Sequence, residues 1–353
     1  MPSEPDPIDA QAVWFSEPHV AEIRRERVAP PGAGEIRVRA LTSAISHGSE
    51  MLVYRGEAPR ELPLDLPTLA GSYAFPIKYG YASVGHVIDV GRDVDGFDHG
   101  DRVFVLHPHQ DVYVAPVAVA TRLPNNLPAD LGLFTANLET AVTVLLDTPL
   151  RLGETVVVFG QGVVGLLITQ LLRRAGAGVI IAVDPLEQRR VAALECGADL
   201  ALPPQPNLVE QVRRRSNGRA ADVAIEVSGS GVALQAALDV VADEATVMAV
   251  SWYGTKPVEL TLGGHFHRSR VRIRSSQVGR LDPVLSPRWD LSRRMTMVCD
   301  LLPQLRLTPL ITHRFPFAAA PDAYRLVDTA SDDVLQVALT YTDLDRDVGD
   351  TTM

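Results

Sequence analysis

The sequence predicts a two-domain α/β protein, in which a mainly-β domain comes first and a doubly wound parallel-sheet domain follows. Three observations support this prediction. Up to about residue 125 the chain contains short β-type runs broken by Gly, Pro and Asp. After Pro128, apolar β-branched runs alternate with helical segments, which is typical of a parallel sheet covered on both faces. The length of 353 residues also exceeds what one simple core usually organises.

The first domain, expected over residues 11–128, has regular turn signals and no long helical pattern. This combination favours a compact, mostly antiparallel barrel. Its strand candidates are 35–41, 83–91, 101–106 and 112–124. The polar, acidic segments 1–10 and 343–353 have little to bury and are expected to be flexible tails.

The second domain, expected over residues 129–281, opens with helical spacing at 129–147. Its strand candidates are 155–159, 179–183, 222–227, 245–250 and 271–275. The helices expected between them cover 163–175, 186–196, 207–215 and 231–242. From about residue 282 the alternation stops. A helix at 290–303, strands at 309–317 and 334–341 and a short helix at 321–329 remain.

Composition and charge exclude several classes of protein. The formal net charge of −10 argues against a nucleic-acid partner, which would select a basic surface. The arginine runs at 24–27 and 212–219 are short and are interpreted as solvated helix faces. Two cysteines cannot build a disulfide scaffold or a cysteine-rich zinc site. No apolar run reaches the ~18 residues of a membrane span and the start is acidic, so a cytoplasmic protein without a membrane partner is expected.

The strongest motif is a glycine fingerprint between a strand and a helix. It consists of Gly160, Gln161, Gly162, Val163, Val164 and Gly165, directly after the run TVVVF. Gly160 permits a tight turn, Gly162 lets the backbone approach a pyrophosphate, and Gly165 lets the helix pack closely on the sheet. The pyrophosphate would lie at the positive end of the helix dipole. The motif therefore predicts a Rossmann domain that binds a dinucleotide.

An acidic residue at the end of the next strand bears on the choice of dinucleotide. Asp184 lies 19 residues after Gly165, close to the expected spacing of ~20. Its carboxylate is expected to accept hydrogen bonds from the adenosine ribose and to repel a 2′-phosphate, which favours NAD. Arg189, five residues later, could instead bind that phosphate, so NADP remains an alternative.

With these motifs, the chain from about residue 12 to 342 resembles the medium-chain dehydrogenase/reductase superfamily. Besides the fingerprint, the resemblance lies in the segments 83–105, 225–241 and 311–324. It implies a GroES-like catalytic domain and a Rossmann domain, with the cofactor in the cleft between them. It also implies that residues 282–342 return to complete the catalytic domain, and that two copies form a homodimer through the Rossmann domain.

The resemblance breaks where many members of the superfamily hold a catalytic zinc ion. Ser46 and His47 stand in the region of the expected ligand cysteine, and Tyr81 replaces the ligand histidine. Glu139 lacks the neighbouring cysteine, and the four-cysteine lobe for structural zinc is missing after Asp101. Two of the three usual ligand positions thus carry groups that bind zinc poorly, so the sequence predicts no metal.

A substitute metal site remains as an alternative. His107 and His109 would share one face if that stretch is a strand, and His47 or Glu50 could join them.

Two segments narrow the resemblance further. Residues 46–50, SHGSE, and 75–81, FPIKYGY, resemble a zinc-lacking branch of bacterial proteins that includes bacteriochlorophyllide hydroxyethyl dehydrogenases. This branch implies a small-molecule alcohol or ketone as the substrate, with specialised metabolism as one option for its source, and leaves its identity open.

Without a Lewis acid, hydride transfer to a carbonyl needs hydrogen-bond donors that stabilise the negative charge on oxygen. Tyr81 is the candidate acid, and Lys78 could lower its pKa or contact the substrate. The alternative is that Tyr81 packs in the core and that Lys78 is a surface charge.

Three residues of the 46–50 segment and one glutamate are candidates for proton transfer. His47, Ser49 and Glu50 could pass a proton to solvent, or Ser49 could cap a helix that starts at Glu50. Glu139 is either a relay base or the partner of an arginine.

By family position, loops after the later strands of the second domain should flank the nicotinamide. The cofactor-binding candidates in these loops are Ser228, Ser251, Trp252, Ser276 and Gln277. Hydrophobic packing would explain Trp252 and its neighbour Tyr253 equally well.

The favoured function is a zinc-independent NAD(P)-dependent oxidoreductase that acts on an alcohol or ketone. One alternative is a zinc-free reductase of C=C bonds, of the quinone or enoyl type. The other is a dinucleotide-binding protein without enzymatic turnover, with a structural or sensing role.

Overall fold

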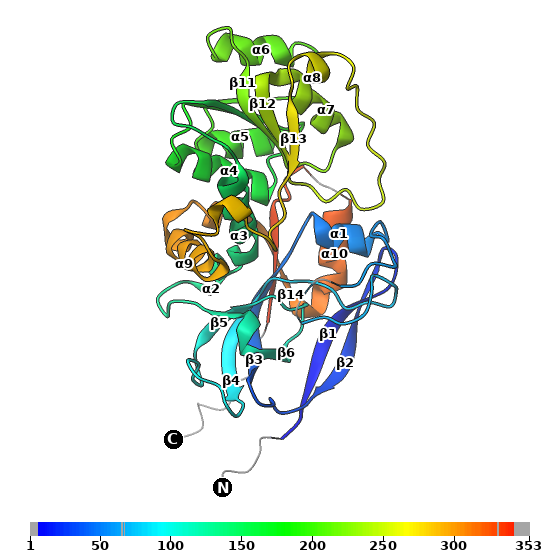
Figure 1. Ribbon diagram of the computed structural model, residues 1–353. Coiled ribbons are helices and arrows are strands. Elements are labelled where there is room, and N and C mark those ends of the chain that lie inside the picture. The colour runs from blue at the N-terminus through cyan, green and yellow to red at the C-terminus, as the bar shows by residue number, and fades with distance from the viewer. Residues whose placement is uncertain (1–5, 65, 67, 330–331, 342–353) are drawn as a thin grey trace. The chain divides into compact units, whose positions relative to one another are not determined.

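The structure of the protein is a computed structural model that describes residues 6–64, 66, 68–329 and 332–341 (Figure 1). The described chain forms two compact units. The first contains the residues up to 136 and those from 307 onward, and the second contains residues 137–306. The sequence analysis places these boundaries at 128/129 and 281/282. The predicted tail 343–353 lies outside the described residues.

The first unit starts with a two-stranded antiparallel sheet that the sequence analysis did not anticipate. It consists of β1 (Ile8–Glu17) and β2 (Val20–Val28), and its pairing begins at Ile8 with Val28. Residues 8–10 are therefore paired and do not belong to a tail. The arginine run 24–27 lies on strand β2, so its interpretation as a helix face is wrong. Arg24 stacks on Trp14 of the facing strand at 5.0 Å, a cross-strand contact that a helix face would not provide.

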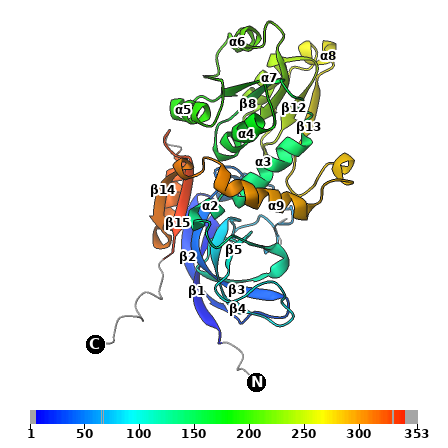
Figure 2. The same ribbon diagram turned by 90° about the vertical axis from the view of Figure 1, so that its left-hand side faces the viewer.

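A seven-stranded sheet forms the rest of the first unit. Its strands are β3 (Glu35–Ile45), β4 (Ser83–Val90), β5 (Arg102–Val105), β6 (Val112–Pro116), β7 (Ala120–Arg122), β14 (Ile311–Pro316) and β15 (Gln336–Thr340). The order is β14-β15-β3-β4-β5-β7, and β6 also pairs with β3. Figure 2 shows β14 and β15, coloured orange to red, near the blue strands of the chain's beginning. Strands from late in the sequence thus belong to the same seven-stranded sheet as β3.

Short helices complete the first unit. They are α1 (Ser49–Tyr54), α2 (Ala129–Gly132), α10 (Ala320–Asp328) and the 3-10 turns η1 (Val117–Val119), η4 (Thr308–Leu310) and η5 (Phe317–Ala319). Valine side chains such as Val38, Val87 and Val103 form the sheet's buried core. The predicted strand 112–124 is divided into β6 and β7 by η1, directly after Pro116, which cannot donate a ladder hydrogen bond.

The second unit is a six-stranded parallel sheet. Its strands are β8 (Thr155–Phe159), β9 (Val179–Val183), β10 (Leu200–Leu202), β11 (Ala221–Glu226), β12 (Val241–Ala249) and β13 (Arg272–Ser275). The order β10-β9-β8-β11-β12-β13 reverses direction between β8 and β11, as in a doubly wound fold. The sequence analysis predicted this fold and five of the strands. It missed β10, whose three residues are only partly buried and too few for a periodic signal.

The helices of the second unit are α3 (Thr135–Asp147), α4 (Val163–Arg174), α5 (Glu187–Glu195), α6 (Leu208–Arg215), α7 (Gly231–Val240), α8 (His265–Arg268) and α9 (Leu291–Leu301), with the 3-10 turns η2 (Pro283–Leu285) and η3 (Leu302–Gln304). Those that pack on the parallel sheet lie on both of its faces. Figure 1 shows α4 and α5 on one side of the sheet and α7 and α8 on the other.

Helix α9 explains why the second unit extends to residue 306 and not to 281. Its Arg294 is 3% exposed and donates a hydrogen bond to Thr143 of α3 at 2.9 Å. The same side chain forms an ion pair with Glu139 of α3. A buried guanidinium needs such partners, so α9 remains with α3 and the parallel sheet.

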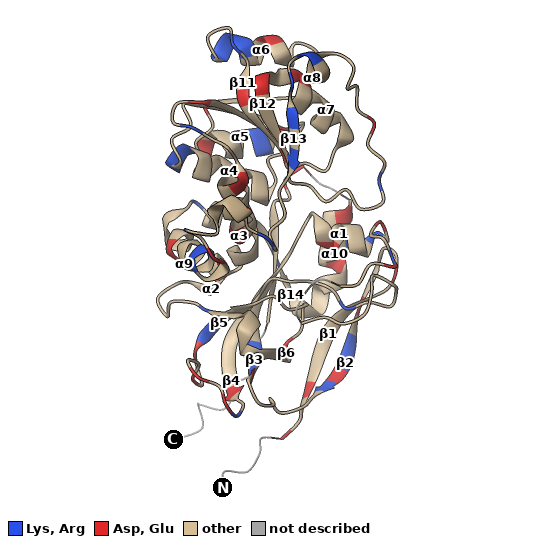
Figure 3. Ribbon diagram, in the orientation of Figure 1, with Lys and Arg blue, Asp and Glu red and all other residues tan. Residues whose placement is uncertain are grey.

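Charged residues of both signs are interspersed along the elements (Figure 3). The arginines 213–215 of α6 are exposed, and Arg214 pairs with Glu210 one turn earlier. Among the residues that the structure describes, no helix is both long and apolar enough to cross a membrane.

The close packing of α4 on the sheet gives a stability prediction. A Cβ on Gly165 would lie 2.0 Å from the carbonyl oxygen of Gly160, whereas a Cβ on Gly162 would have no heavy atom within 4 Å. Gly165→Ala is therefore expected to lower the free energy of unfolding by about 1–3 kcal/mol. The matched control Gly162→Ala should lower it by less than about 1 kcal/mol. Urea unfolding followed by circular dichroism measures both, and equal losses would contradict the close approach.

Candidate functional site

One edge of the parallel sheet gathers the residues expected to bind a dinucleotide. Because all six strands are parallel, their carboxyl ends meet at the same edge. Gly160 follows β8, Asp184 follows β9, Ser228 follows β11 and Ser251 follows β12. The strand order reverses between β8 and β11, and ligands of doubly wound sheets bind outside the carboxyl ends at such a reversal.

The glycine fingerprint has the geometry of a tight strand-to-helix turn. Gly160 has a φ of +94°, a backbone conformation that favours glycine, and a Cβ there would lie 2.8 Å from the Cα of Ser228. Gly162 is the N-cap residue of α4 and has no side chain with which to cap the helix. Val163 and Val164 form the first turn of α4, so their backbone N–H groups point out of its positive end. The turn can thus present amide donors to an anion.

Gln161, the second residue of the fingerprint, acts through its backbone. Its N–H donates to Asp184 Oδ2 at 2.7 Å. Its side chain is fully buried, where the amide nitrogen donates to the Val158 carbonyl at 3.2 Å and the amide oxygen accepts from Thr169 at 3.1 Å. The side chain therefore belongs to the core of the second unit.

The Asp184 carboxylate is fixed at the end of β9. Besides the Gln161 N–H, it accepts a hydrogen bond from the Leu186 N–H at 2.9 Å, and the residue is 2% exposed. An arginine of α5, Arg190, donates a hydrogen bond to the backbone carbonyl of Asp184 at 2.9 Å. Arg189 lies beside it on α5 and is partly buried.

The residues expected near the nicotinamide are held by hydrogen bonds within the second unit. Ser251 Oγ accepts from the Gly229 N–H at 2.8 Å, and Gln277 Oε1 accepts from the Gly279 N–H at 2.7 Å. Ser276 Oγ donates to Asp147 Oδ2 at 2.6 Å. Trp252 is partly buried in the loop after β12.

Ser228 leads to a residue that the sequence analysis missed. Its hydroxyl donates to Glu226 Oε1 at 2.6 Å, and Glu226 is fully buried at the end of β11. The signal in the sequence is a glutamate inside the apolar run DVAIEV. A carboxylate in a strand buried on both faces must be surrounded by donors, and therefore organises what lies around it.

A polar cluster in the first unit contains two of the catalytic candidates, Glu50 and Tyr81. We define the Glu50 cluster as Glu50, Ser46, Tyr81, His109 and Tyr324. Glu50 is fully buried and accepts hydrogen bonds from the Ser46 N–H at 3.0 Å, from His109 Nε2 at 2.8 Å and from the Tyr324 hydroxyl. Tyr81 donates to Ser46 Oγ at 2.5 Å. Ser46, from the region where the sequence analysis expected a ligand cysteine, and Tyr81, where it expected a ligand histidine, thus bond to each other through their hydroxyls.

Tyr81 does not have the environment that the sequence analysis expected. Burial raises the pKa of its hydroxyl, and hydrogen bonds with Ser46 and Ser49 offset this effect only in part. Lys78, expected to lower that pKa, donates instead to Glu26 and Gln110, at 2.8 Å each. The structure thus differs from the expectation for Lys78: its ammonium pairs with the carboxylate of Glu26 on β2. Tyr81 is consequently a neutral hydrogen-bond donor.

The start of α1 also differs from expectation. Ser49 is the first residue of α1, whose N-cap is Gly48, so Ser49 is not the helix cap. Its hydroxyl interacts with Tyr81 instead. His47 is partly buried between Ser46 and this helix.

Glu139 is the partner of an arginine, the second of the two roles considered for it. Its carboxylate forms an ion pair with Arg294, and both side chains are largely buried. Burial raises the pKa of Glu139, while the Arg294 charge and hydrogen bond oppose the shift.

The two histidines of a possible substitute metal site have different partners. His107 stacks on Tyr113 with ring centroids 3.8 Å apart, and its Nδ1 lies 2.9 Å from the Pro108 carbonyl. His109 bonds to Glu50 through Nε2 and lies 2.7 Å from Ser43 Oγ through Nδ1. Within the described part of the chain, no group of three or more His, Cys, Asp or Glu side chains is arranged to hold a metal ion.

The side chains at the positions where the resemblance implies zinc ligands do not fit a zinc ion. At 46 and 81 the donors are two neutral hydroxyls, which are weak zinc ligands, and each already has the other as its hydrogen-bond partner. At 139 the carboxylate is neutralised by Arg294.

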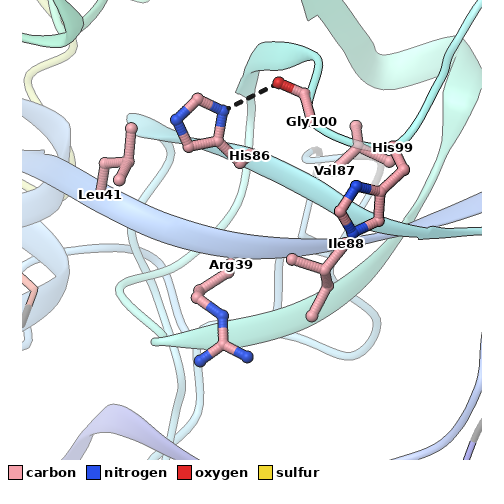
Figure 4. Close-up of a pocket in the computed structure, with 7 residues that line it drawn as sticks. All are labelled: Arg39, Leu41, His86, Val87, Ile88, His99 and Gly100. Atoms are coloured by element: carbon pink, nitrogen blue, oxygen red, sulfur yellow. Dashed lines mark hydrogen bonds between the residues drawn. The ribbon is translucent and has the colours of Figure 1, made fainter. Parts of the chain in front are cut away.

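A cavity of about 280 Å³ lies elsewhere in the first unit (Figure 4). Its lining comes from β3, β4 and the loop before β5, and consists of Arg39, Leu41, His86, Val87, Ile88, His99 and Gly100. None of the site candidates is among these residues. In Figure 4 the Arg39 guanidinium points away from the imidazoles of His86 and His99, so the three bases do not converge on one ligand.

Comparisons with known proteins agree with the fold and with the dinucleotide fingerprint. The profile of the family described as zinc-binding dehydrogenase matches residues 163–292. D-guloside 3-dehydrogenase from Escherichia coli (strain K12) is 27% identical over 329 residues, which cover 88% of this chain and 93% of that protein.

Two solved structures share the fold of the whole chain. A short chain alcohol dehydrogenase from Escherichia coli CFT073, complexed with NADH, has a TM-score of 0.78 at 21% identity and covers 94% of this chain and 99% of its own. The 2R,3R-butanediol dehydrogenase from Bacillus subtilis has a TM-score of 0.77 at 20% identity, with the same coverage of 94% and 99%. Both likenesses support a mainly-β domain joined to a Rossmann domain.

The buried imidazole of His107 gives a prediction about pH. Burial lowers its pKa to about 3, and the hydrogen bond with Pro108 opposes the shift only weakly. The unfolded chain, with a histidine pKa near 6.5, binds this proton more readily. The stabilising contribution is therefore complete above pH 6.5 and is lost as the pH falls towards 3, by up to about 1.4 kcal/mol per pH unit.

His107→Phe should retain the stacking on Tyr113 and reduce this loss of stability between about pH 6 and pH 4. The control variant is His99→Gln, since His99 is exposed. Free energies of unfolding in urea at each pH measure the effect. An unchanged slope in His107→Phe would show that the imidazole is not buried in its neutral form.

Proposed function

We propose that this chain is a member of the medium-chain, zinc-type alcohol dehydrogenase-like superfamily and a zinc-independent oxidoreductase that interconverts a small-molecule alcohol and ketone with NAD. The oxidoreductase class and the dinucleotide rest on its similarity to named dehydrogenases. The finer parts of the proposal are the absence of zinc, the preference for NAD and the donors that replace the metal. Each rests on particular residues.

The sheet edge with Gly160, Gly162 and Asp184 is the observation that carries the proposal. When bound, NAD(H) accepts or supplies the hydride. The first turn of α4 presents amide N–H groups and the positive end of a helix dipole, which suit the pyrophosphate. We assign the backbone N–H groups of Val163 and Val164 to this contact, whereas the N–H of Gln161 holds the Asp184 carboxylate. Gly165 contributes by letting α4 approach the sheet.

The preference for NAD over NADP is inferred from the fixed carboxylate of Asp184. Two backbone N–H groups hold it in place, yet each of its oxygens keeps a lone pair for a ribose hydroxyl. A 2′-phosphate at the same place would meet a carboxylate that cannot turn away. Arg189 stays the candidate for the alternative, since a guanidinium nearby would favour the phosphate.

The donor pair of Tyr81 and Ser46 is proposed to take over the task of zinc. Reduction of a ketone builds negative charge on its oxygen, and a neutral phenol stabilises this charge by donating a hydrogen bond. As the alcohol forms, Tyr81 turns its proton from Ser46 Oγ to the substrate oxygen and transfers it, Ser46 then gives its own hydroxyl proton to Tyr81, and Ser46 takes a proton from solvent by way of His47. Since burial raises the pKa of Tyr81, the phenol holds its proton until charge develops on the substrate.

Glu50 and His109 are proposed to support this donor pair. Glu50 fixes Ser46 through the Ser46 N–H. The His109 ring lies against the backbone before Tyr81, because a Cβ on Gly80 would be 2.9 Å from His109 Cδ2. His47 remains a candidate for proton exchange with solvent. Lys78 and Glu139 have no part in this mechanism, because their charges are neutralised by Glu26 and Arg294.

In this proposal the two units have different tasks. The first is the GroES-like catalytic domain, and the second is the dinucleotide-binding Rossmann domain, with Ser228, Ser251, Trp252, Ser276 and Gln277 on its nicotinamide side. We also propose, from the motifs at 46–50 and 75–81, that the chain is related to the bacteriochlorophyllide hydroxyethyl dehydrogenases and acts on a substrate from specialised metabolism.

A homodimer through the second unit is also part of the proposal. Strand β13 is an edge strand of the parallel sheet, and its Ile273 is 39% exposed. An uncovered edge strand with an exposed apolar side chain is suited to pairing with a second copy. Light scattering tests this part: the mass of one chain, 38.2 kDa, would contradict it.

One experiment tests the main proposal. Purified protein is analysed for metal content, and its affinities for NADH and NADPH are measured by fluorescence. We expect far less than one zinc per chain and an affinity for NADH at least about tenfold higher than for NADPH. Stoichiometric zinc would overturn the zinc-free mechanism, and tighter binding of NADPH would overturn the inference from Asp184.

A second experiment tests the donor and the reaction class. Turnover is compared on panels of secondary alcohols, ketones and enones, and turnover of enones alone would favour a C=C reductase. In Tyr81→Phe, kcat is expected to fall about 100-fold with little change in NADH affinity. The control is Tyr113→Phe, another buried tyrosine, whose hydroxyl bonds to Ser83 at 2.9 Å. An unchanged kcat in Tyr81→Phe would remove Tyr81 from the mechanism.

A further inference from the structure

A carboxylate without contact to water lies at the carboxyl end of β11. Glu226 is 0% exposed, and its Oε1 accepts three hydrogen bonds from the loop that follows the strand. The donors are the Ser228 N–H at 2.7 Å, the Ser228 hydroxyl at 2.6 Å and the Gly229 N–H at 3.0 Å. One oxygen atom thus sets the conformation of the loop between β11 and α7.

The second oxygen of the same carboxylate holds a different loop. Glu226 Oε2 accepts from the Tyr253 hydroxyl at 2.5 Å, and Tyr253 lies in the loop after β12. The two loops are also joined directly, because the Gly229 N–H donates to Ser251 Oγ at 2.8 Å. Burial and the Glu226 charge both raise the pKa of Tyr253, so its hydroxyl keeps its proton and remains a donor.

The loop after β11 supports the glycine fingerprint as well. The backbone of Gly160 lies so close to Ser228 that a Cβ would be 2.8 Å from the Ser228 Cα and from its backbone nitrogen. Glu226 therefore holds two loops at the sheet edge, the loop after β11 and the loop after β12, and the first of these lies against the fingerprint turn. Hydrogen bonds to a charged group are stronger than neutral ones, so the arrangement is stiff.

The strand order indicates which half of a dinucleotide these loops would meet. In the proposed binding mode the adenosine ribose would lie at Asp184, after β9, and the pyrophosphate at the start of α4, after β8. A cofactor that continues in the same direction passes over β11 and then over β12. The two loops held by Glu226 thus lie under the nicotinamide half.

We propose that Glu226 and Tyr253 are positioning residues for the nicotinamide half of the cofactor: the carboxylate joins the loops after β11 and β12 into one preformed surface. This inference rests on the proposed function, in that the cofactor is NAD. Neither residue touches the reacting atoms. They set the shape of the surface that would contact the nicotinamide. Their loss should therefore weaken binding of the nicotinamide half of the cofactor and not of the adenosine half.

The test compares two ligands on the same protein. NADH carries both halves of the cofactor, whereas 5′-AMP carries only the adenosine half that Asp184 would bind. In Tyr253→Phe the hydrogen bond to Glu226 is lost and the loop after β12 is released. We expect the Kd for NADH to rise about tenfold, while the Kd for 5′-AMP changes by less than about twofold.

Two further variants separate positioning from folding. Glu226→Gln retains an oxygen for Ser228 and Gly229, and its amide N–H can donate to the Tyr253 oxygen, so NADH affinity should be close to that of the wild type. Glu226→Ala removes every acceptor and should weaken NADH binding at least as much as Tyr253→Phe. Tyr113→Phe, in the other unit, is the matched control and should leave both dissociation constants unchanged.

The outcomes are distinguishable. Wild-type protein that binds neither ligand would overturn the proposed function, and this inference with it. Wild-type protein that binds both, with NADH affinity unchanged in Tyr253→Phe, would overturn only the positioning role. An equal loss of NADH and 5′-AMP binding would also overturn it, because it would indicate a general effect on the fold.

Discussion

A carboxylate that is removed from water must be surrounded by hydrogen-bond donors, and this requirement arranges both candidate sites of the protein. Glu50 in the first unit and Glu226 in the second are each fully buried. An unpaired charge at either place would cost several kcal/mol, so the donors around it cannot rearrange freely. Around Glu50 they fix the backbone of Ser46, and around Glu226 they fix the loops after β11 and β12. In both cases the carboxylate is proposed to position other groups, Ser46 in the first unit and the two loops in the second, and not to contact the substrate itself.

The same physics supports the proposal that hydroxyl groups at positions 46 and 81 act in place of a metal. Zinc needs thiolate, imidazole or carboxylate ligands, and this chain offers Ser46 and Tyr81 there. Two hydroxyls can be buried together at low cost, because each satisfies the other. Burial also keeps the phenol neutral. The proposed catalyst is thus a donor whose strength comes from its position and not from an acidic pKa.

Two charged catalytic candidates, Lys78 and Glu139, form salt bridges. Lys78 lies three residues before Tyr81 in the sequence, but its ammonium forms an ion pair with Glu26 of β2. Glu139 meets Arg294 of α9. A charge that is neutralised by a close partner of opposite sign interacts only weakly with a substrate. The uncharged donors Tyr81 and Ser46 are therefore the better candidates.

The sequence by itself determined the features that depend on neighbours along the chain. Alternation of apolar runs predicted the parallel strands, and the glycines at 160, 162 and 165 predicted the turn into α4, because strand, turn and helix propensities act locally. The position of Asp184 after β9 follows from the same regular spacing. The zinc-ligand positions could likewise be examined residue by residue.

Only the tertiary structure decided which side chains meet. Glu50 and His109 are 59 residues apart, Glu50 and Tyr324 are 274 apart, and Glu139 and Arg294 are 155 apart. No local pattern encodes such pairs, since they arise when a sheet closes or a helix returns to its unit. For that reason the sequence identified Tyr81 but not the cluster that holds it, and identified the dinucleotide edge but not Glu226 beneath it.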